Sequence, residues 1–243
     1  MGRTVGLRWA LLRLVSRGVR VIGEHLMDYA ACDGRHDRVR VPVVTQFVER
    51  DRQRPLPIDV TSDESVRTAV ELVREEAGLL DVLVNNAGIV TNEAGVADGS
   101  KPISEVTAAD LETIYATNVF GIVRVTHAFL PLLSAADHPV VVNVSSGLGS
   151  LARVTDPQRF EAARFPAYAS SKSAVNMLTV QYAEALPEFK INAADPGYTA
   201  TDLNDHRGTK TVQEGADIIV RLATIGADGP TGGYFAADGP VPW

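Results

Sequence analysis

The sequence predicts a single α/β domain over residues 1–243, with a doubly wound parallel sheet. From residue 55 onward, apolar runs without polar alternation, typical of strands buried on both faces, alternate with amphipathic stretches of helical length. Repeated β–α units of this kind imply right-handed crossovers between parallel strands. A chain of 243 residues, 45% of them hydrophobic, can bury a full core.

The regular elements follow one another from residue 54. A short apolar run, RPLPIDV, is expected to be a strand that ends near Asp59. Ser62 or Asp63 is a suitable N-cap for the next helix, and Gly78 is a suitable terminator. Further strands are expected at 80–88, 139–146, 190–197 and 232–239, and further helices at 108–133, 168–185 and 212–224.

Residues 1–54 do not share this regularity. They contain eleven arginines and no lysine and carry a net charge of +5, whereas the remainder carries −12. One interpretation is a basic interaction arm. The interpretation we favour is a misassigned start or a partly out-of-frame translation of GC-rich coding sequence. The five arginines and the lack of acids in the first 22 residues also resemble an organelle transit peptide, a weaker alternative.

The overall composition limits the classes of partner. A net charge of −7 argues against nucleic acid or an anionic membrane as the main partner. No apolar run approaches the roughly 20 residues of a membrane span. The single cysteine, Cys32, excludes an internal disulfide framework and favours a reducing compartment, so a cytoplasmic location is expected. We expect no metal site.

Polar clusters follow the predicted strands at the points where the strands end. They are Asp59, Asn85–Gly88, Ser145-Ser146 and Pro196-Gly197. Each could simply turn the chain or cap a helix. Ligands of doubly wound sheets bind beyond the carboxyl ends of the strands, however. The shared position of these clusters therefore favours a binding site there.

The stretch YASSK contains a candidate acid–base pair. Tyr168 and Lys172 are four residues apart, so they share one face of a helix. A nearby ammonium favours the phenolate and lowers the tyrosine pKa from its usual value of about 10. Tyr168 could then donate a proton to a carbonyl oxygen. Taken alone, the spacing fits an ordinary surface pair equally well.

Five motifs together resemble the short-chain dehydrogenase/reductase family. They are NNAG at 85–88, TNVFG with Asn118, NVSSGLGS with Ser146, YASSK, and DPGYTAT at 195–201, in the family's order. The resemblance covers roughly residues 54–243 and is closest to the carbonyl-reductase branch. It implies a Rossmann-like fold and hydride transfer between a carbonyl or alcohol and a nicotinamide cofactor, with NADPH (bound as NADP) expected rather than NAD.

The resemblance also implies roles for the catalytic residues. Tyr168 would protonate the carbonyl oxygen, while Lys172 would lower the Tyr168 pKa and hydrogen-bond the nicotinamide ribose. Ser146, rather than Ser145, would hold the substrate oxygen. Asn118 would anchor a water molecule that resupplies protons through Lys172. Tyr168 follows Ser146 by 22 residues, which exceeds the family's common spacing, and the extra segment is expected beside the substrate.

Cofactor contacts follow from the same resemblance. Asp59 and Val60 would meet the adenine, Asn86 to Gly88 the adenosine ribose, and Thr199 and Thr201 the carboxamide. Asn143 would be a structural hydrogen-bonding residue. The full set of implied cofactor-binding residues is Gly2, Gly6, Asp59, Val60, Asn86, Ala87, Gly88, Tyr168, Lys172, Pro196, Gly197, Thr199 and Thr201.

The N-terminus departs from the family pattern. Gly2 and Gly6 align with the first two glycines of a phosphate-binding loop, but Arg8 replaces the third. The first strand, normally central in the sheet, is then missing. Residues 38–44 are the candidate to fill its place, although Pro42 argues against a central position. We therefore expect weak dinucleotide binding.

Two functions are compatible with this sequence. The first is an active reductase of a moderately apolar carbonyl compound. The second is a catalytically impaired remnant of the family that acts as a binding or interaction module. The tetrad of Asn118, Ser146, Tyr168 and Lys172 favours the first, because a remnant has no physical reason to retain all four residues. Substrate identity, reaction direction and the choice between monomer and homo-oligomer stay open.

Overall fold

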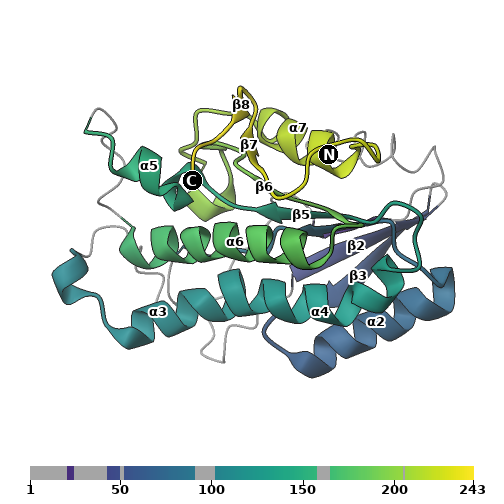
Figure 1. The fold of residues 1–243 in the computed structure, drawn as a ribbon. Helices are drawn as coiled ribbons and strands as arrows, with labels where there is room; N and C mark the ends of the chain where they lie inside the picture. The colour runs from purple at the N-terminus through teal and green to yellow at the C-terminus, as the bar shows by residue number, and fades with distance from the viewer. Residues whose placement is uncertain (1–20, 25–42, 50–51, 91–101, 158–164, 205) are drawn as a thin grey trace.

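The fold is built on one eight-stranded sheet (Figure 1). The structure is a computed structural model that describes residues 21–24, 43–49, 52–90, 102–157, 165–204 and 206–243. The strand order is β3-β2-β1-β4-β5-β6-β7-β8. The strands are β1 (Val21–Glu24), β2 (Val43–Glu49), β3 (Arg52–Ile58), β4 (Val82–Asn85), β5 (Val140–Val144), β6 (Lys190–Ala194), β7 (Tyr234–Ala236) and β8 (Gly239–Pro240).

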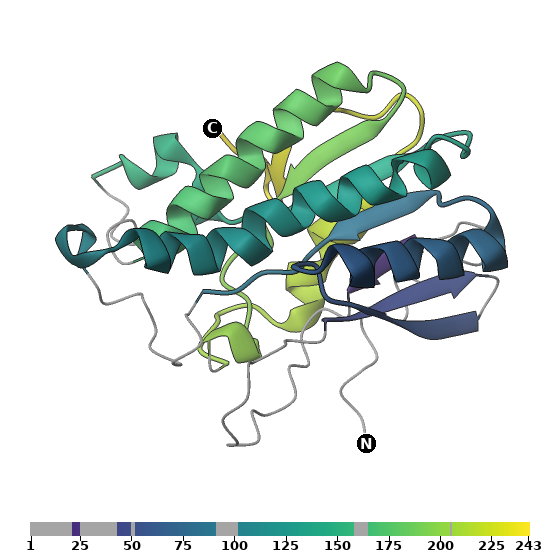
Figure 2. The ribbon, with the colours of Figure 1, turned by 90° about the horizontal axis from the view of Figure 1, so that it is seen from below.

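Helices cover both faces of the sheet. Figure 2 shows α2, α4 and α6 side by side over one face, and Figure 1 shows α7 on the other. The helices are α2 (Asp63–Ala77), α3 (Ala108–Tyr115), α4 (Gly121–Leu133), α5 (Leu151–Val154), α6 (Pro166–Ala185) and α7 (Val212–Ala223). Short 3-10 turns span Ile103–Glu105, Gly147–Gly149 and Asp202–Asn204, and a π turn spans Ala116–Phe120. The predicted doubly wound architecture is confirmed.

The central strands are buried on both faces, as their unbroken apolar sequences predicted. Leu83 of β4 and Val141 of β5 point into the cluster formed with α2 and α4. Their neighbours Val82 and Val140 point into the opposite cluster, formed with α7. Successive side chains of a strand face opposite ways, so strands between two helical layers must be apolar at every position.

Helix α2 begins and ends where the sequence predicted. The Ser62 side chain accepts a hydrogen bond from the Ser65 backbone N–H and is the N-cap. Gly78 ends the helix with a φ of 74°, and its N–H donates to the carbonyl of Arg74. A residue without Cβ adopts this left-handed conformation at little cost.

The predicted helix over 108–133 is present but is interrupted by the π turn between α3 and α4. In the described part of the chain, this one helical run, Ala108–Leu133, is long and apolar enough to cross a membrane, with a mean hydropathy of 1.3 in its most apolar window. Half of that window is buried inside the fold. Packing of α4 against the sheet therefore accounts for its apolar character.

The N-terminal side of the sheet differs from expectation. The place beside β4 is occupied by β1, which pairs with β4 in parallel, and not by residues 38–44. Only residues 43–44 of that segment lie in a described strand, β2, which is one place further out. The central place is therefore filled by residues that follow the Gly2–Gly6 stretch. Gly2, Gly6 and Arg8 lie outside the described residues.

The sheet is also mixed rather than wholly parallel. Strand β2 is antiparallel to both β1 and β3, and β7 is antiparallel to β8. Only residues 50–51 separate β2 from β3, and only two residues separate β7 from β8. A connection this short can join only antiparallel strands, because a parallel crossover needs a dozen or more residues.

The 3-10 turn at Gly147–Gly149 is pressed against α6. A Cβ placed on Gly149 would lie 2.7 Å from the backbone carbonyl carbon of Lys172 and 2.9 Å from its Cβ. The Gly149 carbonyl accepts hydrogen bonds from the side chains of Ser173 and Asn176, at 2.9 and 3.1 Å. The missing side chain is what allows the turn to approach the helix this closely.

We expect Gly149→Ala to destabilise the protein, because the added methyl group must push the turn away from α6. Overpacking of this kind costs about 1–3 kcal/mol. Each kcal/mol lowers the Tm of a chain of this size by about 2–4 °C, which a thermal unfolding measurement resolves. Gly226→Ala is the matched control, since a Cβ there meets no atom within 4 Å. Equal Tm values for the two variants would contradict this account.

Candidate active site

The polar clusters identified in the sequence lie at one edge of the sheet. Strands β4, β5 and β6 are parallel, so their carboxyl ends point the same way. Strand β3 also runs in this direction, because two successive antiparallel pairings separate it from β1, which is parallel to β4. The expectation that residues following these strands share an edge is confirmed.

Helix α6 carries Tyr168 and Lys172 on one face. The Lys172 side chain is buried, and its Nζ donates a hydrogen bond of 2.8 Å to the carbonyl of Val144, at the end of β5. The same Nζ lies 5.6 Å from the centroid of the Tyr168 ring. The two residues are therefore a pair held against the sheet, not an exposed pair on a helix surface.

The pKa of Tyr168 differs from expectation. It is raised to about 12, mainly by burial, while the Ser146 side chain, a hydrogen-bonding neighbour, lowers it and the Asp195 carboxylate raises it. The ammonium of Lys172 is directed to a backbone carbonyl. Tyr168 is accordingly protonated at neutral pH, which is the state that a proton donor requires.

The structure separates the roles of the two serines. Ser145 is buried, and its hydroxyl donates to Oδ1 of Asn176 at 2.6 Å, which ties β5 to α6. Ser146 is half-buried and adjoins the Tyr168 phenol. Its backbone carbonyl accepts a hydrogen bond of 2.5 Å from the hydroxyl of Tyr234. This arrangement agrees with Ser146 as the residue that faces a substrate.

Asn118 lies in the π turn and is fully buried. Its Oδ1 accepts from the Ile89 N–H at 2.8 Å, and its Nδ2 donates to the Ile89 carbonyl at 2.9 Å and to the Ser171 hydroxyl at 3.0 Å. Both amide hydrogens are therefore engaged within the protein. The side chain joins the segment after β4 to α6, one residue from Lys172.

Buried amides and hydroxyls connect the helices through the sheet below the site. Nδ2 of Asn85 donates to the Thr126 hydroxyl of α4 and to Oδ1 of Asn143 on β5. Nδ2 of Asn143 then donates to the Thr179 hydroxyl of α6. The predicted structural role of Asn143 agrees with this geometry, and Asn85 proves to share it.

The segment after β4 lies against the catalytic residues. A Cβ placed on Gly88 would lie 3.5 Å from Nζ of Lys172 and 3.7 Å from Oδ1 of Asn118. Gly88 is half-buried, as is Asn86, and Ala87 is buried. The proposed ribose-lining residues and the tetrad therefore meet in three dimensions.

The segment after β6 offers polar atoms suited to a ligand. Gly197 has a φ of 74°, and the buried Thr199 hydroxyl lies 3.2 Å from the Gly197 carbonyl. Thr201 is only 2% exposed, and its hydroxyl has no hydrogen-bond partner among the described residues. A buried hydroxyl without a partner is costly, so a bound polar group would satisfy it.

Asp59 and Val60, the residues expected at the adenine, make contacts within the protein. One carboxylate oxygen of Asp59 accepts hydrogen bonds from the backbone N–H and the hydroxyl of Thr61. Val60 is buried, and its side chain is in close contact with Gly121 at the start of α4. Asp59 therefore shapes the turn before α2, whatever else it contacts.

Candidate substrate contacts are partly visible. Tyr198 is 51% exposed and Leu203 37% exposed, both in the segment after β6. Phe165 is half-buried before α6. Phe160 and residues 91–101 lie outside the described residues.

Sequence reasoning missed several polar residues around Ser146. Arg153 forms an ion pair of 2.7 Å with Asp195, and both side chains are largely buried. Tyr234 holds the Ser146 carbonyl. The motif DPGYTAT contained Asp195, but its partner is 42 residues away in sequence, so no local pattern could identify it.

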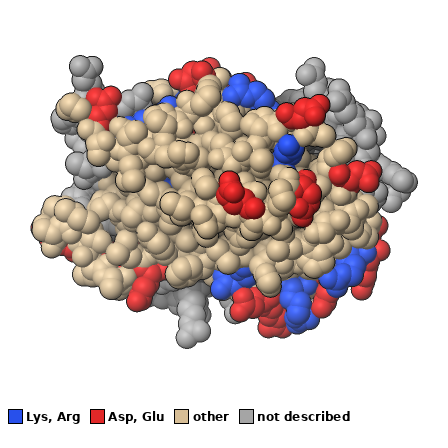
Figure 3. All heavy atoms as spheres, viewed as in Figure 1, with Lys and Arg blue, Asp and Glu red and all other residues tan. Residues whose placement is uncertain are grey.

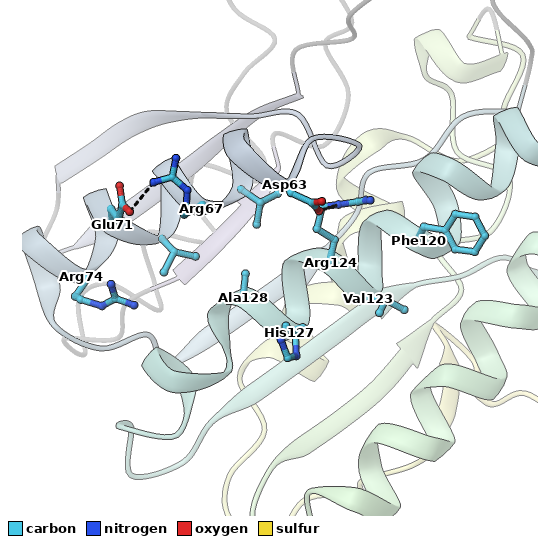
Figure 4. Close-up of a pocket in the computed structure, with 11 residues that line it drawn as sticks. Asp63, Arg67, Glu71, Arg74, Phe120, Val123, Arg124, His127 and Ala128 are labelled. Carbon is cyan, nitrogen blue, oxygen red and sulfur yellow. Dashed lines mark hydrogen bonds and ion pairs between the residues drawn. The ribbon is translucent and has the colours of Figure 1, made fainter.

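A surface groove of about 570 Å³ lies elsewhere, between α2 and α4 (Figure 4). Phe120 at the end of the π turn lines it, together with Val123 and Ala128 on α4. None of the tetrad residues lines it. Figure 3 shows intermixed charges over α2 and a largely uncharged surface over α4 and α6. No group of three or more His, Cys, Asp or Glu side chains suited to a metal occurs in the described part of the chain.

The comparisons with known proteins agree with this geometry. A family profile described as short chain dehydrogenase matches residues 18–211. The short-chain dehydrogenase anuI of Penicillium roqueforti is 38% identical over 180 residues, which are 71% of this chain and 68% of the relative. The (+)-neomenthol dehydrogenase of Arabidopsis thaliana is 29% identical over 97% of this chain and 94% of the relative.

Solved structures are similar as well. NADPH-bound carbonyl reductase from chicken fatty liver has a TM-score of 0.66 and 26% identity, covering 77% of this chain and 76% of that protein. Salutaridine reductase from Papaver somniferum has a TM-score of 0.60 and 27% identity, covering 74% and 80%. The profile match begins after Gly2 and Gly6, in agreement with the unusual N-terminus. The chain belongs to the short-chain dehydrogenase family of oxidoreductases.

Proposed function

We propose that this protein reduces the carbonyl group of a small, moderately apolar molecule with NADPH, with Tyr168 as the proton donor. The observation that carries the proposal is the convergence of the tetrad at the carboxyl edge of the sheet. Tyr168 adjoins Ser146, and Lys172 and Asn118 both lie against Gly88. Relatives such as the (+)-neomenthol dehydrogenase of Capsicum annuum and the (−)-isopiperitenone reductase of Mentha piperita support a small-molecule substrate.

Tyr168 and Ser146 would act on the carbonyl oxygen. The Ser146 hydroxyl, beside the phenol, would hold this oxygen while Tyr168 transfers its proton. The raised pKa keeps the phenol protonated before reaction, but it also disfavours the phenolate that remains afterwards. The buried ammonium of Lys172, 5.6 Å from the Tyr168 ring centroid, would oppose this effect once it shifts from the Val144 carbonyl towards the phenol.

The residues present fit a dinucleotide at this edge. When bound, the nicotinamide supplies the hydride, and the protein supplies placement and a proton. Gly88 leaves space beside Lys172, Thr201 offers a buried hydroxyl without a partner in the described chain, and Gly197 adopts a turn closed to most side chains. The preference for NADP over NAD rests on the likeness to an NADPH-bound carbonyl reductase. A cytoplasmic location is part of the same proposal.

The alternative is an impaired remnant that serves as a binding module. Asn118 and Lys172 are buried and hydrogen-bonded, which favours an active enzyme. Burying an amide or an ammonium costs free energy, so a binding module without catalysis would have little reason to keep them there. The discriminating measurement is turnover of NADPH by the purified chain with a panel of apolar ketones and aldehydes.

Replacing the proton donor tests the chemistry. We expect Tyr168→Phe to lower kcat for carbonyl reduction by about 10²–10⁴-fold, the range typical of a lost general acid, with unchanged circular dichroism. Tyr182→Phe, on the same helix, is the matched control and should retain wild-type activity. Full turnover by Tyr168→Phe would remove Tyr168 from the mechanism.

Lys172→Ala should impair both chemistry and binding, because the proposed role of the ammonium is to act on the phenol and on the ribose. We expect most of kcat to be lost and the dinucleotide Kd to rise about tenfold or more, as for a lost charged hydrogen bond. Lys190→Ala, at the opposite end of β6, is the control. A Lys172→Ala variant that binds as tightly as the wild type argues against the ribose contact.

Cofactor choice is measured by titrating intrinsic tryptophan fluorescence with NADPH and with NADH. We expect tighter binding of NADPH, and a Kd weaker than micromolar because Arg8 replaces the third glycine of the phosphate loop. Tighter binding of NADH overturns the cofactor preference. Micromolar binding of NADPH would instead show that the N-terminal residues bind phosphate well.

A further inference from the structure

An ion pair lies directly beside the candidate catalytic serine. Nη1 of Arg153 is 2.7 Å from Oδ2 of Asp195, with exposed side-chain fractions of 16% and 6%. Arg153 belongs to α5, in the long segment between Ser146 and Tyr168, and Asp195 directly follows β6. Removing one partner of a pair this well buried strongly destabilises the folded protein, because the remaining charge is left without compensation.

The pair is packed against the backbone that carries Ser146. A Cβ placed on Gly147 would lie 3.1 Å from Nη1 of Arg153 and 3.1 Å from Oδ2 of Asp195. Glycine at 147 therefore allows both charged groups to reach the backbone one residue from the serine. The second oxygen, Oδ1 of Asp195, accepts the Gly197 N–H at 3.0 Å, so the same carboxylate also shapes the turn after β6.

Further hydrogen bonds secure both ends of the ion pair. The Ser150 hydroxyl caps α5 by accepting from the Arg153 N–H at 3.0 Å, and it donates to the Pro242 carbonyl at 2.6 Å. The Asp195 N–H donates to the Phe235 carbonyl of β7 at 2.8 Å. Next to Phe235, Tyr234 donates its hydroxyl to the Ser146 carbonyl. The Arg153–Asp195 ion pair is thus part of a hydrogen-bonded network around Ser146.

The electrostatic effect of Asp195 reaches the Tyr168 phenol, and that of Arg153 reaches the Tyr234 phenol. The charged or titratable groups near Tyr168 include Lys172 on α6, Asp195 after β6 and Tyr234 on β7, and Arg153 on α5 is the partner of Asp195. The Asp195 carboxylate raises the pKa of Tyr168 and of Tyr234, and Arg153 opposes the effect on Tyr234. Burial is the largest cause of both shifts.

We propose that the Arg153–Asp195 ion pair is a positioning device for the candidate active site, which fixes the Ser146–Gly147 backbone and offsets the Asp195 charge beside the Tyr168 hydroxyl. The inference rests on the proposed reductase function for its kinetic consequence, but not for its geometry. It assigns a purpose to the start of the long segment between Ser146 and Tyr168, which supplies the cation for Asp195.

Charge-neutralising variants test the proposal through the pH dependence of reduction. The acid must be protonated, so activity persists below its pKa and is lost as the pH rises through it. Arg153→Met leaves the carboxylate uncompensated, which should move the alkaline limb of kcat to higher pH by about 1 unit and lower the plateau at least about tenfold. Asp195→Asn should move the limb to lower pH by a similar amount.

The double variant Arg153→Met/Asp195→Asn removes both charges of the pair, so the net charge of the pair stays zero as in the wild type, and the limb should return to its wild-type position. Arg67→Met is the matched control, because it breaks a surface ion pair of 2.9 Å with Glu71 and should shift nothing. A merely structural role would lower the rate in all three variants without opposite shifts of the limb. That result would overturn the proposal.

A measurement without substrate or cofactor separates this proposal from the proposed function. Tyrosinate absorbance is followed with rising pH for each protein, and the signal of its Tyr168→Phe counterpart is subtracted to isolate Tyr168. Readings stop where circular dichroism begins to change. Ionisation should begin at the lowest pH in Asp195→Asn and at the highest in Arg153→Met. Identical onsets would refute the electrostatic role even if the enzyme is active, whereas ordered onsets support it even if no turnover is found.

Discussion

The close packing of the segment after β5 on helix α6 is the contact on which the candidate active site depends. Ser146 lies in that segment and Tyr168 lies in the helix. The packing of the two backbones therefore determines the distance between these two side chains. Gly149 brings the turn to within van der Waals contact of the Lys172 backbone, and Asn176 bonds to the segment at both ends, through Ser145 and the Gly149 carbonyl. A larger residue at 149 would separate the two parts of the site.

Most of the polar groups below the site are neutral and paired. The amides of Asn85 and Asn143 connect α4, the sheet and α6 through hydrogen bonds of 2.8 to 3.0 Å. Neutral amides can be buried at modest cost once their hydrogen bonds are satisfied, and such networks favour one arrangement of the core. The charged groups, Lys172 and the Arg153–Asp195 pair, lie at the edge where chemistry or a ligand can use them.

The two sides of the sheet follow different physical rules. Between β4 and β6, helical crossovers force parallel strands, and the apolar sequences of these strands made their burial predictable. On the other side, β2 and β3 are joined by two residues and must be antiparallel. β-branched residues indicate a strand, but they specify neither its direction nor its place in the sheet. The sequence of residues 38–44, including Pro42, therefore could not show that β1 takes the central place beside β4.

The sequence by itself determined the alternation of strands and helices from residue 55 and the caps of α2, because these depend on local periodicity and short spacings. The Tyr168–Lys172 pair followed from its helical spacing, whereas Asn118 and Ser146 followed from the resemblance to a family. Tertiary structure alone decided that the Ser145 hydroxyl is bonded to Asn176, that the Tyr168 pKa is raised, and that Arg153 pairs with Asp195. Each of these depends on burial and on contacts between residues far apart in the chain. Burial changes the free energy of a charge by an amount that no local sequence pattern encodes.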